Sequence, residues 1–129
     1  MRLLLDTHVL LWALGNPGRL DAAARAMLED TGNEVFFSAA SIWEIAIKAR
    51  LGRADFDHGP EEITREARAA GFVELPVFCD AAILVETLPS HHRDPFDRLL
   101  VAQAMAGPSR LLTADPLLKQ YSELVLLIS

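Results

Sequence analysis

Short runs of apolar residues alternate along the chain with longer stretches in which apolar and polar residues recur at helical spacing. Runs without internal alternation predict strands buried on both faces of a sheet. They cover residues 3–5, 35–37, 110–113 and 124–128. A further run, residues 72–77, contains Pro76, which lacks a backbone donor and therefore predicts a short strand at the sheet edge.

The intervening stretches carry helix signals at their ends. Asp21 and Asp94 suit N-cap positions, Pro60 and Pro95 suit a first helical turn, and glycines follow several segments. The expected helices cover residues 9–14, 22–29, 41–51, 60–70, 81–88, 95–106 and 116–121. Strands that alternate with helices predict an α/β fold with a parallel sheet and helices on both faces. Because no repeat or linker interrupts the pattern, residues 1–129 are expected to form a single domain.

Composition narrows the class of protein. The 129 residues are 51% hydrophobic and 23% charged, which indicates a well-cored globular protein and excludes disorder. The net charge of −6 does not by itself favour nucleic acid or an anionic membrane. Cys79 is the single cysteine, which excludes an internal disulfide and a cysteine-ligated zinc. No apolar run reaches the length needed to span a bilayer, so the default expectation is a cytoplasmic protein.

Two acids follow predicted strands directly. Asp6 comes after the leucines at 3–5, and Asp115 follows the strand at 110–113. Both could simply cap the next helix. In open α/β sheets, however, ligands bind outside the carboxyl ends of the strands, which favours a site role for Asp6. For Asp115, cap and ligand are both plausible.

Two further acids lie on predicted helices. Glu44 shares a polar stripe with Ser41 and Lys48 between apolar flanks, so it is either half of a solvent-exposed Glu–Lys pair or a buried carboxylate. Asp97 stands in the first turn of the helix after Asp94 and can point toward the sheet edge, whereas capping alone explains Asp94. Two carboxylates about 4 Å apart repel by about 4 kcal/mol at an effective dielectric near 20. Four gathered together therefore predict a divalent metal bound through oxygen.

The remaining candidates are weaker. His91 and His92 could form an acid/base pair, but adjacent side chains usually diverge, and His8 could extend a metal shell or simply be partly buried. The aromatic residues Trp12, Trp43 and Phe96 fall on apolar faces and are expected in the core. Several basic residues close in sequence to the acids could neutralise phosphates, which is the favoured interpretation, or could simply be solvated at the surface: Lys48, Arg50, Arg53, Arg93, Arg98 and Lys119.

Four segments together resemble the PIN-domain ribonucleases, and specifically the VapC-type toxins of bacterial toxin–antitoxin pairs. They are Leu-Leu-Leu-Asp6-Thr7-His8, Ser41-Ile42-Trp43-Glu44-Ile45-Ala46-Ile47-Lys48, the stretch from His91 through Asp94-Pro95-Phe96-Asp97-Arg98 to Ala104, and Leu112-Thr113-Ala114-Asp115. The likeness covers nearly the whole chain, and the third segment is the most specific.

The resemblance implies a three-layer α/β/α sandwich and Mg²⁺- or Mn²⁺-dependent endonucleolytic cleavage of RNA. The family's catalytic and metal-binding acids fall on Asp6, Glu44, Asp97 and Asp115, with Asp94 as an additional metal ligand, and Thr113 matches a hydroxyl residue that supports the site. It also implies a homodimer and a cognate VapB-like antitoxin that inhibits the enzyme. Transfer RNA, ribosomal RNA and messenger RNA are all compatible substrates.

Three other readings stay open. A phosphatase with an aspartyl nucleophile would resemble the Asp-x-Asp pattern after the first strand, but His8 occupies the second acidic position. A metal-independent ribonuclease could use His91 or His92 with the ribose 2′-hydroxyl as nucleophile. An interaction module in which the acids only cap helices would gain no stability from metal ions.

Overall fold

The computed structural model describes residues 1–52 and 58–128. Five strands in this part of the chain form one sheet in which every neighbouring pair is parallel. In spatial order they are β3 (Val73–Leu75), β2 (Glu34–Ser38), β1 (Arg2–Leu5), β4 (Arg110–Thr113) and β5 (Val125–Leu127). The prediction that the run containing Pro76 forms an edge strand is confirmed, because β3 lies at one end of the sheet.

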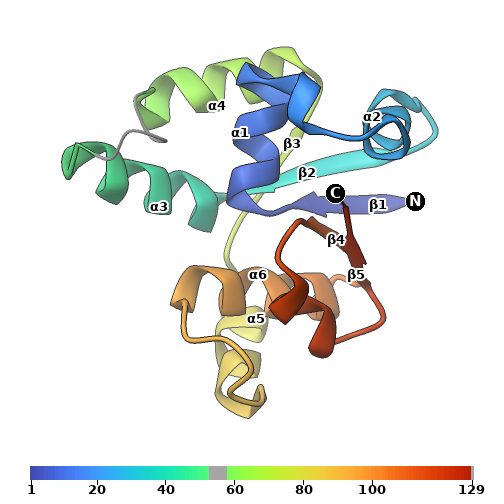
Figure 1. Cartoon of the computed structure of the whole chain (residues 1–129). Coiled ribbons are helices and arrows are strands. Elements are labelled where there is room, and N and C mark those ends of the chain that lie inside the picture. The colour runs from blue at the N-terminus through green and yellow to red at the C-terminus, as the bar shows by residue number, and fades with distance from the viewer. Residues whose placement is uncertain (53–57, 129) are drawn as a thin grey trace.

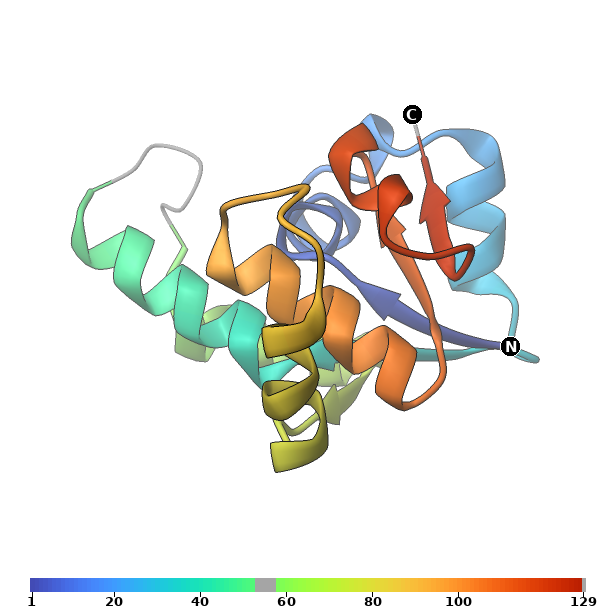
Figure 2. The ribbon, with the colours of Figure 1, turned by 90° about the horizontal axis from the view of Figure 1, so that it is seen from below.

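Helices cover both faces of the sheet (Figures 1 and 2). One face carries α1 (Thr7–Gly15), α2 (Ala22–Glu29), α3 (Ala39–Arg50) and α4 (Pro60–Ala69). The other carries α5 (Cys79–Leu84), α6 (Pro95–Ala106) and the 3₁₀ segment η4 (Pro116–Gln120). The 3₁₀ segments η1 (Pro17–Arg19) and η3 (Val85–Thr87) follow α1 and α5. The predicted α/β/α layering is confirmed.

The central strand β1 contributes side chains to the hydrophobic cores on both faces of the sheet. Leu3 and Leu5 of β1 pack under α1 to α4, whereas Leu4 packs against α5 and α6, and all three are fully buried. A strand covered on both faces has no solvent-facing side, which is why the sequence there shows an unbroken apolar run.

Several local predictions differ from the structure. The helix expected over residues 81–88 is α5 followed by the 3₁₀ segment η3, and the helix expected over 116–121 is the 3₁₀ segment η4. Trp43 was expected in the core but is 60% exposed. The reason is the orientation of α3: its buried face carries Ser41, Glu44 and Ile45, so Trp43 lies on the outer face.

The order of the strands creates a switch point between β1 and β4. From β1 the chain moves through β2 to β3 on one side of the sheet, and β4 and β5 then add on the other side. Asp6 follows β1 directly, and its backbone N–H donates to the Leu112 carbonyl of β4 at 3.0 Å. Ligand sites of open α/β sheets lie outside the carboxyl ends of the strands at such a point. In the described part of the chain, no helix has the length and apolar character needed to cross a membrane.

Candidate metal centre

Asp6 is held from both sides at the end of β1. Its Oδ1 accepts the Val9 N–H at 2.8 Å, which makes Asp6 the N-cap of α1, and its Oδ2 accepts the Thr113 hydroxyl from β4. The same Thr113 oxygen accepts the Asp115 N–H at 3.0 Å. Burial raises the pKa of Asp6, and the charge of Glu44 raises it further. The hydrogen bonds from Thr113 and Val9 oppose this increase. Capping and membership of the acidic site are therefore compatible.

Glu44 is buried, with 3% of its side chain exposed. Its Oε1 accepts the Thr7 hydroxyl at 2.6 Å, and its Oε2 pairs with Lys48 Nζ at 2.5 Å. The Ser41 hydroxyl lies 3.0 Å from Thr7 Oγ1 in the same buried network. The Glu44–Lys48 pair expected from the helical spacing exists, but it points inward and not toward solvent.

Asp97 is a carboxyl whose pKa is raised by burial and by the charges of neighbouring acids. Burial, followed by the charges of Asp94, Asp6 and Glu44, raises its pKa to about 7, against the opposing effect of His92. Asp94, Asp6 and Glu44 therefore act electrostatically on Asp97, but among the described residues none of the three belongs to a group of potential ligand atoms that all lie within 4.8 Å of one another.

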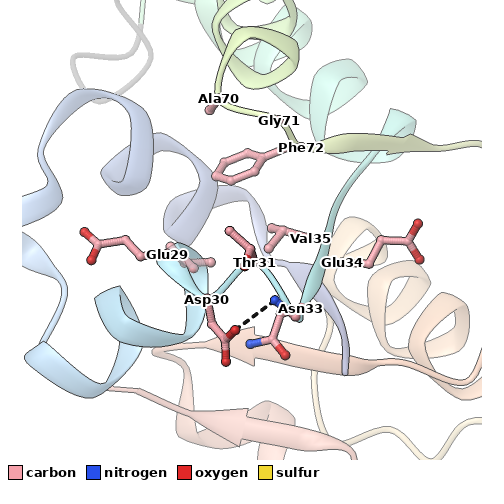
Figure 3. A pocket seen from close by; sticks show the side chains of 11 residues that line it. Glu29, Asp30, Thr31, Asn33, Glu34, Val35, Ala70, Gly71 and Phe72 are labelled. Atoms are coloured by element: carbon pink, nitrogen blue, oxygen red, sulfur yellow. Dashed lines mark hydrogen bonds between the residues drawn. The ribbon is translucent and has the colours of Figure 1, made fainter.

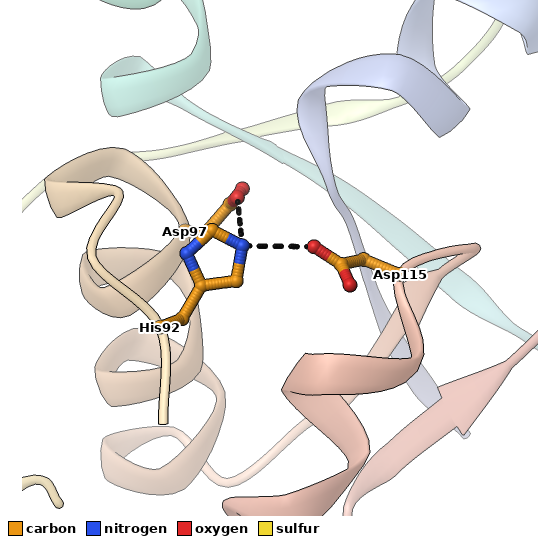
Figure 4. Close-up of side chains that lie close together, drawn as sticks. All are labelled: His92, Asp97 and Asp115. Atoms are coloured by element: carbon orange, nitrogen blue, oxygen red, sulfur yellow. Dashed lines mark hydrogen bonds and ion pairs between the residues drawn. The ribbon is translucent and has the colours of Figure 1, made fainter. Parts of the chain in front are cut away.

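Asp115 and Asp97 form the more accessible side of this cluster, with 34% and 21% of their side chains exposed. Figure 4 shows that one nitrogen of the His92 imidazole faces a carboxylate oxygen of each of them. His92 Nε2 is 2.8 Å from Asp115 Oδ2 and 3.4 Å from Asp97 Oδ2. Asp115 Oδ1 accepts the Leu117 N–H at 3.0 Å, so Asp115 also caps a helical segment.

Asp94 is the N-cap of α6, as its sequence context predicted. Its Oδ1 accepts the N–H groups of Phe96 at 2.8 Å and Asp97 at 3.3 Å. Its charge is also the second-largest cause of the raised Asp97 pKa, after burial. Asp94 therefore belongs to the electrostatic neighbourhood of the site whether or not it touches a metal.

The donor set fits a divalent cation. The acidic cluster, defined as Asp6, Glu44, Asp94, Asp97 and Asp115, supplies carboxylate oxygens, which Mg²⁺ and Mn²⁺ prefer. Among the described residues, His92, Asp97 and Asp115 each offer one potential ligand atom, and these three atoms all lie within 4.8 Å of one another. Burial and then the neighbouring negative charges raise the Asp97 pKa, and a cation beside Asp97 would oppose both effects by favouring the ionised carboxylate.

The PIN domain family model matches residues 3–124, nearly the whole chain. The chain belongs to the PIN domain family. Its likeness to the VapC type of PIN domain rests on "Ribonuclease VapC22" of Mycobacterium tuberculosis (strain ATCC 25618 / H37Rv). The two sequences are 30% identical over 122 residues, which cover 92% of this chain and 90% of that protein.

Two solved structures share the PIN fold of this chain. One comes from the crystal structure of VapBC2 from Rickettsia felis bound to a DNA fragment from its promoter, with a TM-score of 0.72, 12% identity and full coverage of both chains. The other is a domain of a functionally unknown protein from Methanocaldococcus jannaschii DSM 2661, with a TM-score of 0.61 and 17% identity. It covers 99% of this chain and 91% of that one. At these identities the likeness concerns the fold alone.

Several residues around the PIN-domain acids were not anticipated from the sequence. His92 was given little weight, yet it contacts two of the acids, whereas His91 turns away and its ring lies 5.0 Å from that of Tyr121. Thr7 was not singled out, although its position directly after Asp6 was a usable signal. His8, expected to be partly buried unless it joined the site, is exposed on the surface of α1.

The basic residues behave differently from one another. Arg98 was a candidate either for phosphate contacts or for surface solvation, but its guanidinium donates to backbone carbonyls and to the Tyr121 hydroxyl. Lys119 Nζ donates to the Val125 carbonyl at 2.8 Å. Arg50 and Arg93 are exposed and stay candidates for phosphate contacts. Arg53 lies outside the described residues.

A cavity of about 650 Å³ opens elsewhere, at the amino-terminal ends of β2 and β3 (Figure 3). Residues 28–35 and 70–72 line it, including Glu29, Asp30 and Phe72. None of the predicted site acids is among them. The cavity and the acidic cluster therefore lie at opposite ends of the strands.

Proposed function

We propose that this chain is a VapC-type endoribonuclease that hydrolyses RNA phosphodiester bonds with Mg²⁺ or Mn²⁺. The proposal is supported by the contacts that link the predicted site acids: Thr113 joins Asp6 to the backbone of Asp115, Thr7 hydrogen-bonds to Glu44, and His92 Nε2 lies within 3.4 Å of both Asp115 and Asp97. Membership of the PIN family and the likeness to a VapC ribonuclease support the same activity.

In this proposal Asp6, Glu44, Asp97 and Asp115 are the catalytic acids, and together with Asp94 they hold the metal. A divalent cation, when bound, supplies a Lewis acid and a bound water of lowered pKa. The protein fixes the carboxylates beforehand: Val9 and Thr113 orient Asp6, as Thr7 and Lys48 orient Glu44. Asp97 and Asp115, the more exposed pair, would meet the substrate side.

A matched pair of variants tests the proposal. Asp6→Asn keeps an N-cap, since asparagine caps helices as well as aspartate does, but it removes a charge from the acidic cluster. Asp21→Asn makes the same change at the N-cap of α2, where Asp21 accepts the Ala24 N–H at 2.7 Å. With total RNA and Mg²⁺ or Mn²⁺, we expect Asp21→Asn to cleave like the wild type and Asp6→Asn to be inactive. Equal activity of the two variants would contradict the proposal.

We also propose that residues 1–129 act as one domain in the cytoplasm and that a VapB-like antitoxin inhibits the enzyme. The support for the antitoxin is the VapC-type likeness and the fold shared with a structure of a VapBC complex. Adding such an antitoxin in equimolar amount should stop RNA cleavage without lowering the amount of folded enzyme.

A homodimer is the last part of the proposal, and one surface of α3 supports it. Trp43, Ile47 and Leu51 follow one another at intervals of four residues and are 60%, 39% and 70% exposed. An apolar stripe of this kind gains stability when a second copy covers it. By light scattering we expect Ile47→Asp to be monomeric and Ile83→Asp, which changes an exposed residue of α5, to remain dimeric. A monomeric wild type would refute the dimer.

A further inference from the structure

The segment between η3 and α6 carries His92 to the accessible side of the acidic cluster, with 16% of its side chain exposed. Both ring nitrogens have partners. Nε2 lies 2.8 Å from Asp115 Oδ2 (Figure 4). Nδ1 lies 3.0 Å from the backbone nitrogen of Asp94. Rotating the ring by 180° would put carbon atoms in both places, so the two contacts together fix its orientation.

These contacts also fix the tautomer. The Asp94 backbone always presents an N–H, so Nδ1 must accept with its lone pair and cannot carry a proton. In the neutral ring the proton therefore sits on Nε2, which donates to Asp115. A metal ligand needs a free lone pair, and Nε2 in this tautomer has none. The proximity of His92, Asp97 and Asp115 thus describes two carboxylates and a hydrogen-bond donor, not three ligands.

The backbone around His92 is tied down by its own network. The Tyr121 hydroxyl accepts the His92 N–H at 2.9 Å and lies 3.1 Å from Arg98 Nη1, which donates to it. The Arg98 guanidinium also donates to the carbonyls of Val85, Leu88, Pro89 and His92. The hydrogen bonds of the Arg98 guanidinium therefore hold in place the segment between η3 and α6, which carries the His92 imidazole.

We propose that His92 is a positioning residue that holds the Asp115 carboxylate, through its Nε2–H, in place for the metal and is not itself a ligand. This inference rests on the proposed metal-dependent function. Asp115 is the more exposed partner of the pair, and the Leu117 N–H fixes its other oxygen, so His92 completes its orientation. Each carboxylate oxygen keeps a second lone pair for a cation. Partners of this kind typically change metal affinity by about 10- to 100-fold when they are removed.

Two variants separate the donor from the rest of the ring. In His92→Gln the amide nitrogen reaches about as far as Nε2 and can still donate to Asp115. In His92→Asn the side-chain oxygen can still accept the Asp94 N–H, but no donor reaches Asp115. His91→Asn, at the neighbouring residue that turns away from the acids, is the control.

Mn²⁺ binding measured by calorimetry and electron paramagnetic resonance tests the proposal without RNA. We expect His92→Asn to bind about 10- to 100-fold more weakly than the wild type, and His92→Gln and His91→Asn to bind nearly as tightly as it does. A wild type that binds no Mn²⁺ would refute the proposed function together with this inference. If the wild type binds Mn²⁺, two results would refute the inference alone. One is that His92→Asn binds Mn²⁺ as tightly as the wild type, and the other is that His92→Gln loses as much Mn²⁺ affinity as His92→Asn.

The wild type provides a second readout that does not depend on how the variants fold. Nitrogen-15 spectra of the His92 ring report which nitrogen carries the proton. We expect the Nε2–H form both before and after saturation with Mg²⁺. Loss of the Nε2 proton on metal binding would make His92 a ligand and overturn the proposal.

Discussion

Replacing Asp97 by asparagine should stabilise the metal-free protein at high pH. The Asp97 side chain is only 21% exposed, and burial together with the charges of Asp94, Asp6 and Glu44 raises its pKa to about 7 from an ordinary value of 3.8. An asparagine has the same shape but cannot ionise. The variant therefore removes a charge that the folded state tolerates poorly.

The sign and size follow from linkage. Between the unfolded pKa near 4 and the folded pKa near 7, the folded state holds the Asp97 proton and the unfolded state has lost it, so wild-type stability falls as pH rises. The shift of about three pH units corresponds to about 4 kcal/mol at most. Because Asp97 is open to solvent on one side, and solvent screens the charges that act on it, we expect about 1–3 kcal/mol for this residue alone. The advantage of Asp97→Asn should grow up to about pH 7 and then stay constant.

Urea unfolding in EDTA, between about pH 5.5 and about pH 8.5, measures this difference. Asp80→Asn is the control, because Asp80 also lies in a first helical turn but is exposed, and this variant should not gain stability over the wild type as Asp97→Asn does. Saturating Mg²⁺ should reverse the order, since only the wild type would gain its full binding energy. An Asp97→Asn variant that gains no stability over the wild type as pH rises would refute the reasoning about crowded charge.

Three further changes probe the network around the acids, each by urea unfolding. Thr113→Val removes the hydroxyl that donates to Asp6 and should lower the free energy of unfolding by about 1–3 kcal/mol. Thr113→Ser keeps a hydroxyl and should keep most of this stability; equal losses in the two variants would exclude a role for the hydroxyl. Lys48→Met removes the ammonium beside the buried Glu44 and should lower the free energy of unfolding by about 1–3 kcal/mol. The loss should be smaller in saturating Mg²⁺, and a loss that Mg²⁺ leaves unchanged would place the cation away from Glu44. Arg98→Lys cannot reach as many carbonyls and should cost about 2–4 kcal/mol, and a neutral result would show that this anchor is dispensable.

Much of the fold could be predicted from the sequence because the three central strands, β1, β2 and β4, are buried on both faces. The unbroken runs at Leu3, Leu4 and Leu5 and at residues 35–37 leave no doubt about strand positions, and proline and glycine mark the helix ends. Trp43 was misplaced because α3 carries apolar residues on both sides of its polar stripe. Only the packing of the polar stripe against Thr7 decides which side faces inward.

The site could be predicted in part for a related reason. Acids that follow strands of a parallel sheet meet at one edge, so local sequence was enough to nominate Asp6 and Asp115. His92 could not be nominated in this way. Its orientation depends on Tyr121, which is 29 residues away in sequence, and on the Asp94 N–H, and no local pattern records such contacts.

The ends of the cleaved RNA test the central claim most directly. Purified protein would be incubated with total cellular RNA in Mg²⁺ or Mn²⁺, with and without EDTA, and the product ends mapped. A metal-dependent hydrolysis by the acidic cluster predicts 5′-phosphate and 3′-hydroxyl ends that disappear in EDTA and in Asp6→Asn. Cyclic-phosphate ends that persist in EDTA would contradict this account and move the chemistry from the carboxylates to the histidines.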